Sequence, residues 1–231
     1  YTLYLSSAAS DVYKRQASSD DPGGTAVVVL PDIRGLFRFY EELALRFAEE
    51  GFDAVAIDYF GRTAGLDARE DEWDCWPHVD QTTAAGVRRD TAAAIAHLRS
   101  VNPERSIFTV GFCFGGSNSW HQAAEGHGLA GAVGFYGHPD RPGFPQDAPG
   151  VIERIADIEC PILALMGGAD PGIPVAEVAP FDAALTAAGI PHEIVFYEDA
   201  PHSFFDRNQT EFAAASRNAW HRVLGFIATY E

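Results

Sequence analysis

The chain has 231 residues, of which 47% are hydrophobic and 21% are charged, so it is long enough to form one globular domain with a full core. Its formal net charge of −17 opposes binding to nucleic acid and to anionic membrane surfaces, and we expect neither as a partner. No apolar run approaches the ~18 residues of a membrane span. The three cysteines lack metal or redox spacing, which favours free thiols in a reducing, cytoplasmic setting.

Residues 1–24 are predicted to lie outside the folded domain, which we place at residues 25–231. Residues 1–16 have neither an initiator Met nor the basic region of a signal peptide, and residues 11–16 resemble translated adapter sequence. Residues 17–24 are rich in Ser, Asp and Gly, as linkers often are. We therefore expect a non-native or disordered leader and linker here.

From residue 26 onward, short apolar runs alternate with segments of helical periodicity, and there is no internal repeat. The connection 58–81 is too long for a simple turn, so we expect it to form part of a cap or pocket wall. This alternation predicts a single α/β domain with a mostly parallel, doubly wound sheet flanked by helices. The predicted strands are 26–30, 54–57, 106–110, 129–135, 161–166 and 192–197; the predicted helices are 39–50, 83–101, one opening at 116, 175–188 and 210–230, with a proline-rich loop at 139–150.

The sequence Gly111-Phe112-Cys113-Phe114-Gly115 directly follows the predicted strand 106–110 and precedes a helix. This context is that of a nucleophile elbow, G-x-S-x-G, with cysteine in place of serine. The turn requires very small residues two before and two after the nucleophile, which Gly111 and Gly115 provide. Such an elbow lifts the sulfur off the sheet and places the N–H of Phe114 where an oxyanion can form. The alternative interpretation is a buried cysteine beside a glycine-rich turn.

Two further residues follow in the order nucleophile, acid, histidine. Asp170 comes after the strand 161–166 and two glycines, and His202 comes after the strand 192–197. Each of them therefore lies near the end of a predicted parallel strand, where catalytic groups gather. Asp170 could instead cap the next helix, and His202 could be an ordinary loop histidine. The order of all three is that of the α/β-hydrolases.

These three turns, together with the segment Val27 to Gly35 that contains Pro31-Asp32-Ile33-Arg34-Gly35, resemble those of the dienelactone hydrolase (carboxymethylenebutenolidase) family. The resemblance covers roughly residues 25–230. It implies one or two strands before the strand at Val27. It also implies the following roles: Cys113 as nucleophile, His202 as general base, Asp170 as the residue that orients it, and the N–H groups of Ile33 and Phe114 as the oxyanion hole.

The chain departs from the family pattern at positions that would contact the substrate. Asp32 stands where the enzyme that gives the family its name usually carries a glutamate that contacts the cysteine; it could hold Cys113 as a neutral thiol or simply brace its loop. Arg207 is displaced by one residue from a substrate-carboxylate arginine of that enzyme. Tyr136 and Trp76 are candidate pocket walls, but core or loop packing is the favoured interpretation for each. The cations to test against a substrate carboxylate are Arg34, the first choice, then Arg62, Arg88 and Arg207, each of which could equally be a surface arginine.

We expect a cysteine hydrolase that forms a thioester acyl-enzyme with a small-molecule ester or lactone. A thiolate leaves more easily than an alkoxide, so unactivated alkyl esters would revert, which favours enol lactones, activated esters and thioesters. The alternatives are a broad carboxylesterase or thioesterase, and a non-catalytic binding protein of the same fold. We expect a monomer or small homo-oligomer. No cofactor or metal is expected, because no nucleotide-binding or CxxC motif occurs and the histidines show no metal spacing.

Overall fold

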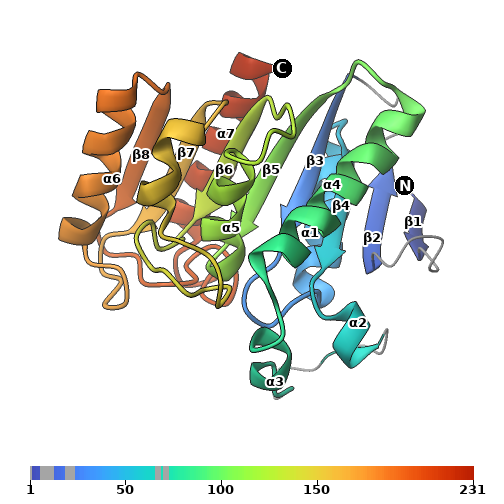
Figure 1. The fold of residues 1–231 in the computed structure, drawn as a ribbon, viewed down its shortest axis with the longest axis horizontal. Helices are drawn as coiled ribbons and strands as arrows, with labels where there is room; N and C mark the ends of the chain where they lie inside the picture. Colours follow the sequence, from blue (N-terminus) through green and yellow to red (C-terminus); the bar gives the residue numbers. More distant parts are fainter. Residues whose placement is uncertain (1, 6–12, 19–23, 66–68, 70–72) are drawn as a thin grey trace.

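The computed structural model describes residues 2–5, 13–18, 24–65, 69 and 73–231. Within them, eight strands form one sheet in the order β1-β2-β4-β3-β5-β6-β7-β8 (Figure 1). β1 and β2 are antiparallel to their neighbours, and the remaining six strands run parallel. The strands are β1 (Thr2–Leu5), β2 (Tyr13–Ser18), β3 (Thr25–Leu30), β4 (Asp53–Asp58), β5 (Ser106–Phe112), β6 (Gly131–Phe135), β7 (Ile162–Gly167) and β8 (His192–Tyr197).

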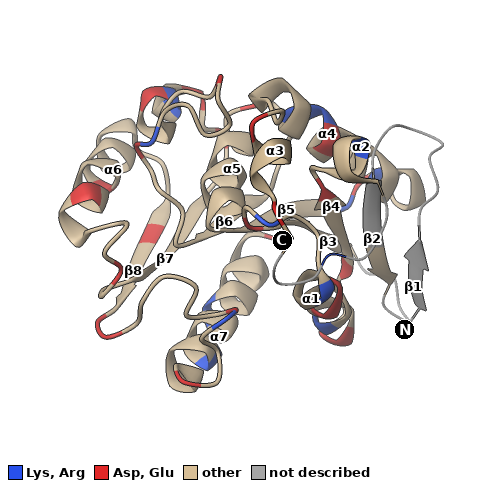
Figure 2. Cartoon of the chain, turned by 90° about the horizontal axis from the view of Figure 1, so that it is seen from below, with Lys and Arg blue, Asp and Glu red and all other residues tan. Residues whose placement is uncertain are grey.

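Helices cover both faces of the sheet, and Figure 2 shows α1 and α7 on one face with α4, α5 and α6 on the other. Strands β3, β4 and β7 are therefore buried along their whole length, which explains why they carry apolar runs without polar alternation, in β4 between its two terminal aspartates. The helices are α1 (Arg38–Glu49), α2 (Gly61–Ala64), α3 (Trp76–Val79), α4 (Ala84–Val101), α5 (Phe114–Gln122), α6 (Val175–Ala188) and α7 (Ala213–Tyr230), with a 3₁₀ helix at Val151–Asp157.

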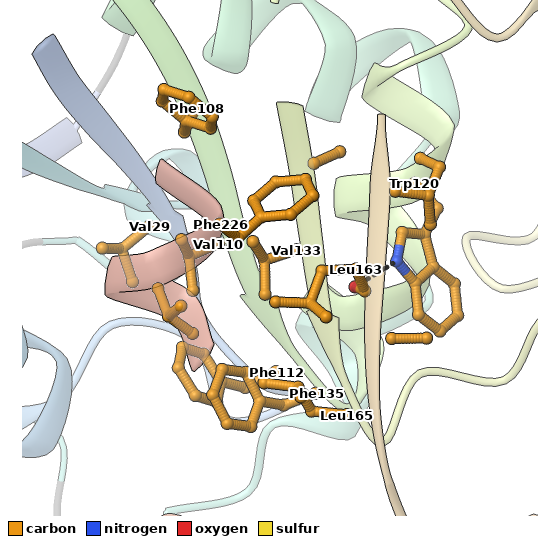
Figure 3. Close-up of a cluster of buried hydrophobic side chains, with 14 of the residues drawn as sticks. Val29, Phe108, Val110, Phe112, Trp120, Val133, Phe135, Leu163, Leu165 and Phe226 are labelled. Atoms are coloured by element: carbon orange, nitrogen blue, oxygen red, sulfur yellow. Dashed lines mark hydrogen bonds between the residues drawn. The ribbon is translucent and has the colours of Figure 1, made fainter. Parts of the chain in front are cut away.

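The core beneath the end of β5 is built from aromatic rings (Figure 3). Phe112 stacks on Phe135 of the neighbouring strand with ring centroids 4.6 Å apart, and on Phe205 at 5.7 Å. All three rings are buried, and each contributes about 1.5–3 kcal/mol by leaving water. Trp120 of α5 donates its indole N–H to the carbonyl of Leu163, which ties that helix to β7. The turn after β5 therefore rests on a rigid, close-packed base.

The predicted alternation of strands and helices is confirmed, and most predicted ends lie within three residues of the observed ones. The structure differs in the connection 58–81, which contains two short helices, α2 and α3. It also differs in the leader, because residues 2–5 and 13–18 form β1 and β2 of the sheet instead of lying outside the domain. β2 pairs with β4, so that backbone groups at that edge of β4 are satisfied.

Candidate active site

Cys113 occupies the turn between β5 and α5, with φ of 53° and ψ of −114°. A positive φ is strained for a residue with a side chain and persists only where the surroundings enforce it. Here they do: the N–H of Cys113 donates to the carbonyl of Phe135 at 2.9 Å, and both flanking glycines are enclosed by backbone. A Cβ on Gly111 would lie 2.9 Å from the backbone nitrogen of Gly116, and closer still to the carbonyl of Gly115. The local geometry is therefore that of a nucleophile elbow.

The loops after β7 and β8 bring Asp170 and His202 together. Nδ1 of His202 lies 2.6 Å from Oδ2 of Asp170, whose side chain is almost fully buried. The other carboxylate oxygen accepts the backbone N–H of Gly172 at 2.8 Å, which fixes the carboxylate plane. Burial raises the pKa of Asp170, but the hydrogen bond and the charge of His202 outweigh it and lower that pKa below its usual value. The acid therefore stays ionised beside the imidazole.

His202 also faces Cys113. Burial lowers the pKa of His202, but hydrogen bonds to Asp170 and Cys113 and their negative charges raise it to about 10. At neutral pH the imidazole is therefore stabilised as imidazolium between the thiol and the carboxylate. The ring of Tyr136 lies 5.0 Å from that of His202 and limits its movement on one side.

The turn after β3 runs alongside the elbow, because Gly115 abuts the carbonyl groups of Leu30 and Pro31. Asp32 donates its N–H to the hydroxyl of Tyr40 at 3.0 Å, and Arg34 donates its N–H to the Asp32 carboxylate at 2.8 Å. Among the described residues, the N–H of Ile33 has no hydrogen-bond acceptor. Phe114 is the first residue of α5, so its N–H has no intrahelical acceptor either. Within the described residues, both backbone N–H groups are thus without an acceptor.

A pocket of about 340 Å³ opens over these residues. Tyr136 contributes to its lining, and its side chain is fully buried and also packs in the core. Trp76 does not contribute: it is 56% exposed at the start of α3 and lies outside this pocket. The lining residues are Cys113, Phe114, Ser117, Tyr136, His138, Arg141, Phe144, Asp170, Pro171, Gly172, Ile173 and His202.

Neither Arg34 nor Arg207 lines this pocket. Arg34 binds the Asp32 carboxylate at 2.6 Å, lies 3.9 Å from Asp206, and stacks over the ring of Phe37 at 4.1 Å. Its charge is therefore already compensated by two buried carboxylates. Arg207 is exposed, and only its backbone N–H meets the Asp206 carboxylate.

The other two candidate cations are also engaged outside the pocket. Arg62 pairs with Asp90, and Arg88 pairs with Glu125 at 3.0 Å. Asp32, for which two roles were open, makes contacts that brace its own turn, and no hydrogen bond joins it to Cys113 among the described residues.

Sequence reasoning missed His138, Arg141 and Phe144, which come from the loop after β6. The proline-rich composition of that loop predicts only a loop, and nothing in it indicates that these side chains would line the same pocket as Cys113. Within the described residues, no cluster of three or more His, Cys, Asp or Glu side chains is arranged to hold a metal ion. Nor does any described helix combine the length and apolarity needed to cross a membrane.

The sheet order and the elbow define the α/β-hydrolase fold. The structure of a Klebsiella pneumoniae protein, provisionally named a dienelactone hydrolase, superposes with a TM-score of 0.84 at 26% identity, over 95% of this chain and 93% of that one. Acylaminoacyl peptidase from Pyrococcus horikoshii shares the fold alone, with a TM-score of 0.77 at 14% identity, over 99% of this chain and 41% of that one.

The model of the dienelactone hydrolase family matches residues 9–231, and this chain belongs to that family. A carboxymethylenebutenolidase from Rhodococcus opacus is 32% identical over 234 residues, covering 93% of this chain and 84% of the relative. Family membership makes this chain a hydrolase that acts on ester bonds. The match begins within the segment that sequence reasoning had assigned to a leader.

Proposed function

We propose that this hydrolase cleaves an activated ester or enol lactone of the dienelactone type, with Cys113 as nucleophile, His202 as base and Asp170 as the group that orients it. What carries the proposal is the position of His202, which is hydrogen-bonded to Asp170 and lies with Cys113 in the lining of one pocket. The name of the Rhodococcus opacus relative supports the substrate class.

In the first half of the reaction, the Cys113 thiolate attacks the carbonyl carbon and the carbonyl oxygen becomes an oxyanion. In this proposal the N–H groups of Ile33 and Phe114 donate to it, and each such donor contributes about 3 kcal/mol. When the intermediate collapses, the C–O bond breaks and the leaving oxygen takes the proton of the His202 imidazolium. In an enol lactone that oxygen stays tethered to the acyl group.

In the second half, water gives a proton to His202 and attacks the thioester carbonyl. The C–S bond breaks, the carboxylic acid product forms, and the thiolate returns to its pairing with imidazolium. Because a thiolate leaves more easily than a simple alkoxide, the acylation step needs an enolate, phenolate or thiolate leaving group. This requirement restricts the substrates to activated ones.

The test is hydrolysis of p-nitrophenyl acetate by wild type and by Cys113→Ala, together with iodoacetamide labelling. Cys113→Ala is expected to abolish turnover. Cys75→Ala is the matched control, because Cys75 is also a free cysteine but is buried outside the pocket, and it is expected to retain activity. Iodoacetamide should label Cys113 before Cys160, since burial raises the pKa of the Cys160 thiol to about 12. Substantial activity in Cys113→Ala would overturn the mechanism.

The substrate class needs its own comparison. A dienelactone, p-nitrophenyl acetate and an acyl thioester are compared by kcat/KM on the same enzyme. Faster turnover of the dienelactone is expected. Turnover of the dienelactone no faster than that of the simple ester would favour a broad esterase and leave the cysteine mechanism standing.

A further inference from the structure

The turn that carries His202 is strained at the residue that follows it. Ser203 has a φ of 58°, in the left-handed region that disfavours residues with a side chain, and it is buried. Such a conformation persists only where neighbouring groups hold it. The peptide plane that joins His202 to Ser203 is set by the ψ of His202 and the φ of Ser203. Whatever holds this plane therefore also orients the backbone from which the imidazole of His202 extends.

Asn208 holds that peptide plane. Its side-chain amide donates to the carbonyl of His202 at 3.1 Å, and no backbone N–H of the described residues donates to the same carbonyl. The backbone N–H of Asn208 donates to the carbonyl of Ser203, also at 3.1 Å. The two carbonyl groups that flank the Cα of Ser203 are thus both bound by one residue, which opposes the relaxation of Ser203 to a negative φ.

Asn208 is itself anchored to α7. Its carbonyl accepts the N–H of Phe212 at 2.9 Å, and Phe212 is the residue that directly precedes this helix. Within α7, the hydroxyl of Ser216 lies 2.9 Å from the carbonyl oxygen of Phe204 and 3.0 Å from that of Phe212. The loop after β8 is therefore fastened to a helix of 18 residues, and the side chain of Asn208 transmits this rigidity to the backbone of His202.

We propose that Asn208 is a positioning residue for the general base: its side-chain amide holds the strained turn at Ser203 and so keeps the imidazole of His202 beside Asp170 and Cys113. This inference rests on the proposed function, because it assumes that His202 serves Cys113. Asn208 is half-buried and lies outside the lining of the pocket, so it acts through His202 and not on the substrate.

The test is a double-mutant cycle that combines Asn208→Ala with Ser203→Gly, because glycine adopts a positive φ without strain. In the wild-type background, Asn208→Ala is expected to lower kcat/KM for p-nitrophenyl acetate about tenfold. In the Ser203→Gly background, where no strain pulls on the turn, the same substitution should lower kcat/KM by no more than about threefold. Asn218→Ala is the matched control and should keep the wild-type kcat/KM, because Asn218 is exposed on α7 and bonds Tyr197 and Arg222.

Asn208→Asp is a second variant that separates the donor from the bulk of the side chain. It keeps the size of asparagine, but an ionised carboxylate has no N–H to donate to the carbonyl of His202. It should therefore lower kcat/KM at least as much as Asn208→Ala does.

A measurement without substrate separates positioning of the base from a purely structural role. Iodoacetamide reacts with the thiolate of Cys113, which the imidazolium of His202 stabilises, so the alkylation rate constant at about pH 6 should fall about fivefold in Asn208→Ala. It should recover when Ser203→Gly is added. An unchanged alkylation rate in Asn208→Ala, an equal loss of kcat/KM in both backgrounds, or wild-type kcat/KM in Asn208→Asp would each overturn the role of Asn208. Failure of the proposed function has a different signature, namely full turnover of p-nitrophenyl acetate in Cys113→Ala.

Discussion

Replacing Gly115 by alanine adds one methyl group where the elbow abuts the turn after β3. The new Cβ would lie 2.6 Å from the carbonyl carbon of Leu30, and closer still to the carbonyl oxygens of Leu30 and Pro31. Ordinary carbon–carbon contacts begin near 3.4–3.5 Å, so the two backbones must separate by about 1 Å. These atoms are main chain, which cannot rotate away as a side chain can. The displacement therefore moves the turn after β3, which carries Ile33, away from Cys113.

The expected consequences are a modest loss of stability and a large loss of activity. Overpacking of a close-packed region costs about 1–3 kcal/mol in the free energy of unfolding. Misplacing one oxyanion donor by about 1 Å costs on the order of 100-fold in kcat/KM. The variant is thus expected to remain folded at room temperature while it loses most of its activity toward p-nitrophenyl acetate.

The assay combines urea unfolding, followed by circular dichroism, with kcat/KM for p-nitrophenyl acetate. Gly225→Ala is the matched control, because Gly225 lies in α7 with no atom within 4 Å of an added Cβ. It should stabilise the helix by up to about 1 kcal/mol and leave kcat/KM unchanged. A Gly115→Ala enzyme with kcat/KM within about threefold of wild type would refute the proposed coupling between the elbow and the oxyanion turn.

Three further predictions concern the charges around the thiol. Asp170→Asn should lower kcat/KM by on the order of 1,000-fold and move the alkaline limb of its pH profile to lower pH, because the carboxylate that raises the pKa of His202 is lost; an unmoved limb would contradict this. The pKa of His202 is raised to about 10 in the folded state. The pairing of its imidazolium with Asp170 should therefore contribute fully to the free energy of unfolding of wild type below about pH 6.5, and this contribution should be lost as the pH rises through 10. The difference in urea midpoint between wild type and Asp170→Asn should therefore become smaller between about pH 6.5 and pH 10. A difference that stays constant would argue against this pairing of His202 and Asp170. Asp32→Asn should lower kcat/KM about tenfold by loosening the turn, without changing the rate of Cys113 alkylation at fixed pH; a changed alkylation rate would favour a gating role.

Much of the fold could be read from short stretches of chain. The apolar runs of β3, β4 and β7 predict buried parallel strands, because a strand covered on both faces carries apolar side chains on both sides. The prediction that residues 1–24 lie outside the domain was wrong for β1 and β2. These are edge strands, and β2 joins the sheet by pairing with β4, which is distant in sequence. The two short helices within 58–81 carry too few residues to show a helical period.

The sequence by itself determined which residues could do chemistry. Cys113 between its two glycines, then Asp170 and His202 after strand ends, form a local pattern in a fixed order, and each turn has its own steric requirement. The tertiary structure alone decided which arginine lines the active-site pocket. Arg34 forms ion pairs with Asp32 and Asp206 outside the pocket. Arg141 lines the pocket, where it contacts Phe144, which in turn packs against Phe114. Whether a charge is neutralised or exposed depends on partners brought together by folding, and spacing along the chain does not encode that.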